Sequence, residues 1–106
     1  MGFAETEIVN KIRLEASKRG WRLFRNHVAL GWVGQPCARC QVFMRRQRFG
    51  LCVGSSDLIG WQPGGRFTAR EVKTARGITT EEQANFIKQV LRDGGDAAII
   101  RSVDEL

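Results

Sequence analysis

The distribution of apolar residues predicts a helix near the start of the chain, over residues 4–19. At 100° per residue the apolar positions fall on one stripe, which consists of Ile8, Val9, Ile12 and Ala16. Gly20 follows two basic residues and is a typical helix stop. Glu5 falls in the middle of the apolar stripe and is expected to point inward, although the helix dipole also stabilises an acid in an exposed first turn.

Later segments show the alternation or the short apolar runs of strands. Strands are predicted over residues 21–30, 42–49, 57–61, 66–73 and 97–101, with a loop over 31–41 and a second helix between the last two strands. That helix begins at Thr79 or Thr80, with Glu82 or Gln83 at the capping-box distance, and it ends at Gly94. We therefore expect an α/β fold in the order α-β-β-β-β-α-β, with helices packed on a mixed sheet. Three strands should form an antiparallel meander, and the last strand should pair in parallel across the second helix.

The two strands over 57–61 and 66–73 form a predicted hairpin, because Pro63, Gly64 and Gly65 supply turn residues between them. If the pairing is centred on Gly64, Asp57 and Glu71 lie opposite each other with Cβ atoms about 5 Å apart. Lys73 lies two residues beyond Glu71 and shares its face, because the side-chain period of a strand is two. A one-residue change of register would separate the two acids.

Two opposed carboxylates with a lysine beside them suit one kind of chemistry. The oxygen pair of Asp57 and Glu71 fits Mg²⁺ or Mn²⁺ with open positions for water and phosphate, and Lys73 can hold an attacking water or the charge that develops on phosphate. The set fits metal-dependent hydrolysis of a phosphodiester. The alternative is a surface Asp with a cross-strand Glu/Lys pair on a solvated face, which is the commoner role for any single E-x-K.

Composition narrows the choice of partner. The 106 residues suffice for one domain, residues 1–106, with a modest core. Seventeen Lys and Arg against eleven Asp and Glu give a net charge of +6, which favours a polyanion such as nucleic acid. No apolar run approaches the roughly 20 residues of a membrane span. An odd number of cysteines without a visible signal peptide predicts a cytoplasmic protein.

Several basic residues are candidates for contacts with DNA. Arg45, Arg46 and Arg48 lie between Phe43 and Phe49 in a predicted strand, a pattern that suits either phosphate contacts or an edge strand protected from aggregation by its charge. The other candidates are Arg25 or Asn26 in the first strand, where a purely structural role is expected equally, and Arg76, which follows the predicted acidic site.

The cysteines raise a different possibility. Cys37 and Cys40 have the spacing of half a zinc site, and Cys52 with the lone His27 would have to complete it. The order and spacing of these four residues match no common zinc motif. Cys52 is equally suited to a buried apolar position, and His27 has no orienting partner in the sequence that would make it a general base.

Longer strings around the acids resemble a known family. The run Gly50-Leu-Cys-Val-Gly-Ser-Ser-Asp57-Leu-Ile-Gly60, then Glu71-Val72-Lys73, Gly77 and Glu82-Gln83, is similar to the VRR-NUC domain of the PD-(D/E)-x-K nuclease superfamily, especially its compact phage members. The resemblance extends from Glu5 to about Ser102, and Ser56 stands where the superfamily name has Pro.

This resemblance implies a restriction-endonuclease-like core and an endonuclease that cuts branched DNA, as Holliday-junction resolvases do. It implies metal ligation by Asp57, Glu71 and the Val72 carbonyl, with Glu5 reaching the ion through water, and it assigns orientation of the nucleophilic water to Lys73. Gln83 would support Lys73 or a water, and its alternative role is half of a capping box. Symmetric cleavage of a junction requires two sites and hence a homodimer, and a phage-encoded enzyme would work in the bacterial cytoplasm. The main rival is a nucleic-acid-binding module without catalysis, and sequence-specific restriction is the rival substrate model.

Overall fold

A computed structural model describes residues 3–34, 39 and 45–106. In chain order the elements are α1 (Phe3–Lys18), β1 (Arg22–Arg25), β2 (Ala29–Val33), β3 (Arg45–Phe49), β4 (Leu58–Trp61), β5 (Phe67–Val72), α2 (Glu81–Arg92), β6 (Asp96–Ile100) and the short 3₁₀ helix η1 (Val103–Glu105). No helix among the described residues is long and apolar enough to cross a membrane.

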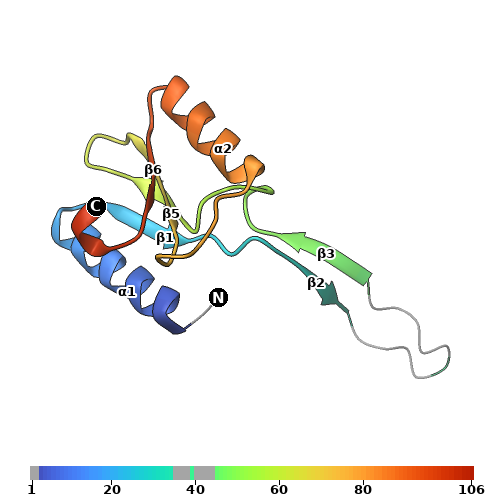
Figure 1. Ribbon diagram of the computed structural model, residues 1–106. Coiled ribbons are helices and arrows are strands. Elements are labelled where there is room, and N and C mark those ends of the chain that lie inside the picture. The colour runs from blue at the N-terminus through green and yellow to red at the C-terminus, as the bar shows by residue number, and fades with distance from the viewer. Residues whose placement is uncertain (1–2, 35–38, 40–44) are drawn as a thin grey trace.

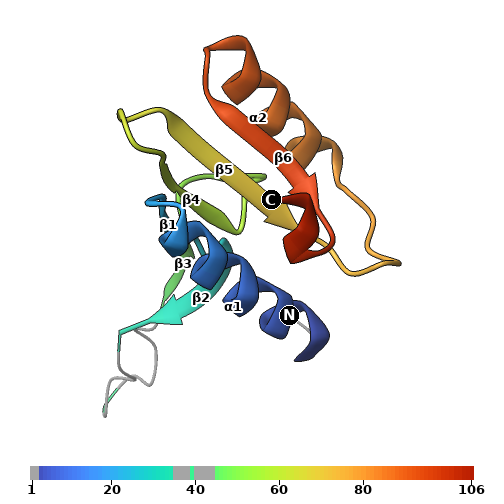
Figure 2. The same ribbon diagram turned by 90° about the vertical axis from the view of Figure 1, so that its left-hand side faces the viewer.

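Four of the strands form one mixed sheet in the order β1-β4-β5-β6. β4 is antiparallel to both β1 and β5, whereas β6 is parallel to β5 after the connection through α2. The two helices cover opposite faces of this sheet (Figure 2). The predicted fold class is confirmed, and the arrangement is compatible with a restriction-endonuclease-like core.

The hairpin of β4 and β5 has the predicted register. Trp61 pairs with Phe67 and Leu58 pairs with Arg70, so the pairing is centred on Gly64. Asp57 directly precedes β4 and Glu71 directly follows Arg70 in β5, so the next positions along the hairpin are the two acids. The turn chemistry of the sequence was therefore sufficient to bring the carboxylates together.

The strand predicted over residues 21–30 is in fact two strands, and this corrects the expected meander. The first piece, β1, ends at Arg25. The next residue, Asn26, still donates its backbone N–H to the Asp57 carbonyl at 2.7 Å, but its side chain is bound to the loop before Asp57. The second piece, β2, pairs with β3 instead of joining the sheet. We call β2 and β3 the ribbon, a two-stranded unit that projects from the body of the protein (Figure 1).

The extent of β2 also corrects the start of the loop that was predicted over residues 31–41. Residues 31–33 belong to β2, so the loop begins later than residue 31. Cys37, Cys40 and the predicted strand start at residue 42 lie outside the described residues. The ribbon returns to the body at Gly50, whose φ is +92° and where a Cβ would lie 2.8 Å from the His27 carbonyl oxygen. Only glycine fits so close a crossing.

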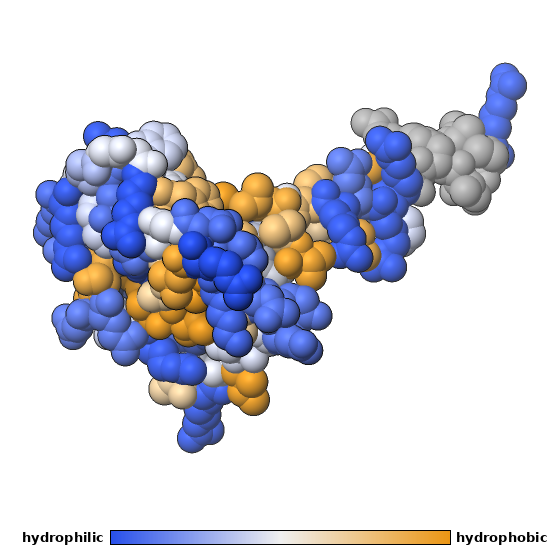
Figure 3. All heavy atoms as spheres, turned by 90° about the horizontal axis from the view of Figure 1, so that it is seen from above, coloured by the Kyte–Doolittle hydropathy of each residue, from blue (hydrophilic) through white to orange (hydrophobic). Residues whose placement is uncertain are grey.

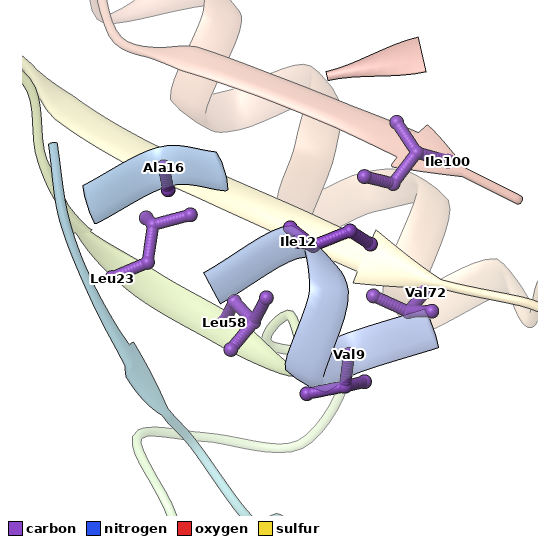
Figure 4. Close-up of a cluster of buried hydrophobic side chains, with 7 residues drawn as sticks. All are labelled: Val9, Ile12, Ala16, Leu23, Leu58, Val72 and Ile100. Atoms are coloured by element: carbon purple, nitrogen blue, oxygen red, sulfur yellow. The ribbon is translucent and has the colours of Figure 1, made fainter. Parts of the chain in front are cut away.

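The core lies between α1 and the sheet (Figure 4). Its buried side chains are Val9, Ile12 and Ala16 from α1 and Leu23, Leu58, Val72 and Ile100 from the four strands. This confirms the apolar stripe of the first helix. Since side chains alternate along a strand, Val72 and Arg70 face α1, and Glu71 between them faces α2. Packing on one face of β5 thus fixes the direction of the acid on the other face.

The α2 face of the sheet is covered only in part. The main contacts of α2 are with β5 and β6, which leaves the half formed by β1 and β4 open. Phe24 and Trp61 are exposed on that half, with ring centroids 5.7 Å apart, and Phe67 lies beside them. This aromatic patch, defined by Phe24, Trp61 and Phe67, is an apolar surface of the kind that marks an interaction site.

Candidate active site

The two acids open into a pocket at the end of the sheet where β4 begins and β5 ends. Its volume is about 550 Å³, and Asp57, Glu71 and Lys73 line it. The other walls come from Glu5 at the start of α1, His27 and Val28 at the base of the ribbon, residues 53–55 before β4, and Thr80, Glu82 and Gln83 at the start of α2. Segments that are far apart in the sequence therefore meet around the acid pair.

Asp57 is oriented by the backbone of the neighbouring strand. The Val72 N–H donates to its Oδ2 atom at 2.8 Å. Within a strand, the N–H and C=O of one residue point towards the same neighbour. The Val72 carbonyl is therefore directed to the same side of β5 as the Asp57 carboxylate, which agrees with the ligand role that the family resemblance implies.

Glu71 is a buried acid, and one of its two carboxylate oxygens has no hydrogen-bond partner. Its side chain is 3% exposed, and Oε1 accepts from Gln83 Nε2 at 3.0 Å and lies 3.6 Å from Lys73 Nζ. The Oε2 atom is buried without a hydrogen-bond partner. Burial and, after it, the charge of Asp57 raise the pKa of Glu71 from 4.5 to about 7, although the charge of Lys73 offsets part of the rise.

These properties fit a divalent cation. A buried carboxylate oxygen without a partner is costly, and a cation between Asp57 and Glu71 would satisfy it and relieve their repulsion. Mg²⁺ is typically bound by one or two carboxylates and keeps several waters. Among the described residues, no three acidic, His or Cys side chains gather closely enough to hold an ion directly. Glu5 lines the same pocket, so a contact through water is the role its position allows.

Gln83 has both a capping role and a role in the active site, which the sequence had offered as alternatives. Its Oε1 accepts from the Thr80 N–H at 3.0 Å, its own N–H donates to Thr80 Oγ1 at 3.2 Å, and these bonds form the capping box of α2. At the same time its Nε2 donates to Glu71. The sequence predicted support of Lys73 or a water, whereas the bond observed is to the acid itself. Gln83 thus ties the position of Glu71 to the first turn of α2.

Asn26 occupies a structural position, which was one of the two roles that the sequence left open for it. The side chain is 8% exposed, and its Nδ2 donates to Ser55 Oγ at 2.7 Å and to the Ser56 carbonyl at 2.9 Å. Its Oδ1 accepts from the Leu51 N–H at 2.9 Å. Asn26 therefore holds the loop before Asp57 against the end of β1. The sequence left a structural role open but did not predict these partners, since nothing in the local pattern identifies the partners of a single Asn.

Three of the five predicted arginines lie on the ribbon, and two lie outside it. Arg45, Arg46 and Arg48 are exposed along β3, in the ribbon. Arg25 ends β1, and Arg76 is exposed in the segment between Lys73 and α2. Of the zinc candidates, His27 lines the acidic pocket and Cys52 is an exposed free thiol. The predicted buried position of Cys52 is therefore wrong, because its side chain is exposed. Cys37 and Cys40 lie outside the described residues.

In this site one acid lies just before a strand, and a second acid and a lysine, two residues apart, lie at the end of the next strand. All three side chains line one pocket, and this combination defines a class of enzyme. This is the arrangement of nucleases of the PD-(D/E)-x-K type, enzymes that hydrolyse phosphodiester bonds and generally use divalent metal ions. Comparison with family models places the chain within that class: residues 33–104 match the VRR-NUC domain, and the chain belongs to this family. No curated protein matches it significantly. Its partner is therefore DNA.

The matched region contains Asp57, Glu71, Val72, Lys73 and Gln83. It begins after β1, so Glu5, Arg25 and Asn26 precede it. The acid pair and its lysine thus lie within the region that the family model matches, and the first-helix acid lies outside it.

The raised pKa of Glu71 predicts how stability depends on pH without metal. Glu71 binds its proton more tightly in the folded protein, with a pKa of about 7, than in the unfolded chain, where it is 4.5. Stability in EDTA should therefore fall as pH rises from about 4.5 to 7 and then level off. Thermal unfolding between these pH values measures it. Glu71→Gln should flatten this part of the profile, and an unchanged profile in the variant would assign the effect to another group.

Proposed function

We propose that this protein is a metal-dependent endonuclease that cuts DNA at branch points, in the manner of a Holliday-junction resolvase. The observation that carries the proposal is the pairing of Asp57 with a buried Glu71, whose free oxygen has no partner, beside Lys73 in an open pocket. An Asp and a Glu/Lys pair on a solvated surface would not bury the acid in this way.

Each residue of the site has a proposed role. Asp57, Glu71 and the Val72 carbonyl would hold Mg²⁺ or Mn²⁺, and Glu5 would hold one of its waters. When bound, the ion polarises a phosphoryl oxygen and lowers the pKa of a coordinated water. Asp57 is kept in place by the Val72 N–H, and Glu71 by Gln83. The ligands are thus preorganised by one strand and one helix.

Lys73 lies on the pocket side of Glu71, with its ammonium 3.6 Å from the carboxylate. A compact cation at this point can fix the attacking water by a hydrogen bond and stabilise the charge that develops on phosphate. Its side chain is 16% exposed, so little competing water surrounds it. We assign the positioning of the nucleophile to Lys73 and the support of Glu71 to Gln83.

The choice of branched DNA follows the family resemblance, and a four-way junction requires two cuts. One site cuts one strand, so symmetric resolution requires a homodimer. The aromatic patch on the open half of the sheet supports self-association, since aromatic side chains are enriched in the buried centres of interfaces. No dedicated base-reading helix occurs among the described residues, which favours recognition of DNA shape over a sequence.

Cleavage of matched substrates tests the proposal. Labelled four-way junction, flap and linear duplex DNA of one sequence would be incubated with Mg²⁺, Mn²⁺ or EDTA. We expect metal-dependent cutting of the branched substrates, little cutting of the duplex and none in EDTA. Glu71→Gln should abolish cleavage, and Glu81→Gln, the same change at an exposed site on α2, should retain it. Binding without cutting under every metal condition would leave a non-catalytic nucleic-acid-binding module as the better account.

A further inference from the structure

The two faces of the ribbon differ in composition. Directly opposed residues share a face, so Leu30 and Trp32 of β2 lie on the same side as Arg48 and Arg46 of β3. The opposite side carries Arg45, and there the ring of Phe49 lies over Gly31, 3.1 Å from where a Cβ would be. We call the side with Leu30, Trp32, Arg46 and Arg48 the Trp32 face.

Trp32 is an exposed aromatic ring prepared for a flat partner. Its side chain is 63% exposed, and the Arg46 guanidinium lies 5.8 Å from the ring centroid. A cation near an exposed ring is a favourable contact that helps to hold the indole in position. The apolar surface of this ring is exposed to water, which is unfavourable, and a ligand stacked on the ring would cover it.

The positive charge of the ribbon favours a negatively charged ligand. Neither β2 nor β3 contains an acidic residue, and all three arginines are exposed. A second copy docked by the same face would place these like charges against one another, which is destabilising. A polyanion with planar groups satisfies both the arginines and the indole. Nucleic acid with an unpaired base has this chemistry, because aromatic side chains stack on free bases and basic side chains follow the backbone.

The ribbon is also joined to the active site. His27 and Val28, which lead into β2, line the acidic pocket, as do residues 53–55 shortly after the ribbon returns. In Figure 3 the ribbon extends outward from the body, with apolar side chains set among hydrophilic ones. DNA held in the pocket would thus have its flanking part within reach of the ribbon.

We propose that the Trp32 face binds DNA beside the scissile phosphate, with Trp32 stacked on a base left unpaired at a branch point and Arg46 and Arg48 on neighbouring phosphates. The inference rests on the proposed function for the position of the DNA, and it adds an element that detects unpaired bases. It predicts that the same chemical change has different effects on the two sides of the ribbon.

Binding measured in EDTA tests the inference without relying on cleavage. Fluorescence anisotropy would compare DNA that contains a short single-stranded gap with fully paired duplex of the same length. Trp32→Ala should weaken binding to the gapped DNA about 10-fold or more, within the range for loss of one stacked base. It should change duplex binding less than about 2-fold, and Trp32→Phe should restore most of the affinity for gapped DNA.

The arginines provide the matched control. Arg46→Gln and Arg48→Gln should each lower the slope of log affinity against log salt by about 0.7–0.9, the value of one phosphate contact. Arg45→Gln, which removes the same charge from the opposite side, should leave the slope unchanged. Equal effects at Arg45 and Arg46, or equal effects of Trp32→Ala on gapped and paired DNA, would overturn the inference. So would a fall in molecular mass of Trp32→Ala in sedimentation, since this would identify the face as a self-association surface.

The two proposals fail in different ways. If binding depends on Trp32 as predicted but no metal supports cutting, the ribbon inference stands and the nuclease activity does not. If branched DNA is cut normally and Trp32→Ala has wild-type affinity for gapped DNA, only the ribbon inference is overturned.

Discussion

Replacement of Lys73 by Met should reduce the single-turnover cleavage rate by roughly 10²–10³-fold, the usual effect of removing one preorganised group that stabilises transition-state charge. Met lacks the ammonium but keeps an unbranched apolar stem, with sulfur in place of the δ-methylene. Lys73 lies in the pocket beside Glu71 and packs its stem against Gly77, where a Cβ would be 3.2 Å from the Lys73 side chain. Rates measured with enzyme in excess and saturating metal separate this loss from weaker binding.

A matched control is available on α2. Lys88→Met makes the same chemical change at an exposed position outside the pocket and should cut at the wild-type rate. Metal affinity should survive in Lys73→Met, because the oxygens of Asp57 and Glu71 are unchanged. Wild-type cleavage by Lys73→Met would remove lysine from the mechanism and leave the carboxylates to act alone.

The largest expected effect on stability lies at the other end of the sheet, at Asp96. Its Oδ2 atom is 2.9 Å from the guanidinium of Arg70, a side chain only 6% exposed that also lies 5.2 Å from the Trp21 ring. Removing one partner of a buried ion pair typically costs about 3–5 kcal/mol, because the other charge remains buried. The lower end of this range applies here, since the Asp96 side chain is 27% exposed and Arg70 keeps a bond to the Ala69 carbonyl. Asp96→Ala should therefore lower the free energy of unfolding, measured with urea, by about that amount.

Dependence on pH distinguishes the ion pair from a packing defect. The hydrogen bond from Arg70 lowers the pKa of Asp96 below 3.8. Its stabilising contribution is therefore present above pH 3.8 and is lost as pH falls through the lower folded-state value. The difference between wild type and Asp96→Asn should shrink in that range. Asp104→Ala, which removes an exposed acid, should change stability by less than about 0.5 kcal/mol.

The hairpin and its acids could be predicted from sequence because the information is local. Turn residues around Gly64 fix the register, and the period of two then decides which side chains face each other. The stripe of the first helix and the cap of the second followed in the same way from helical periodicity and from Thr80 and Gln83. All of these features follow from the periodicity of one element, from a cap or from one tight turn.

The features that sequence reasoning missed depend on distant contacts. The strand predicted over residues 21–30 has no local signal for its interruption, which lies at Asn26, whose side chain is bound to Leu51, Ser55 and Ser56. The pairing partner of β2 is likewise decided by tertiary structure. The bond from Gln83 to Glu71 joins a helix cap to a strand 12 residues earlier, and the sequence placed the Gln near the site without identifying its acceptor.

The ribbon enters and leaves the body at one point, where the Leu51 N–H bonds to Asn26 and Gly50 crosses the backbone at His27. Its length therefore has no influence on the spacing of β1 and β4, which pair with each other whatever lies between them. In the proposed function, the reach of the ribbon towards DNA and the geometry of the acid pair are therefore set by separate residues. The ribbon can therefore be lengthened, shortened or replaced without a change in the acid pair.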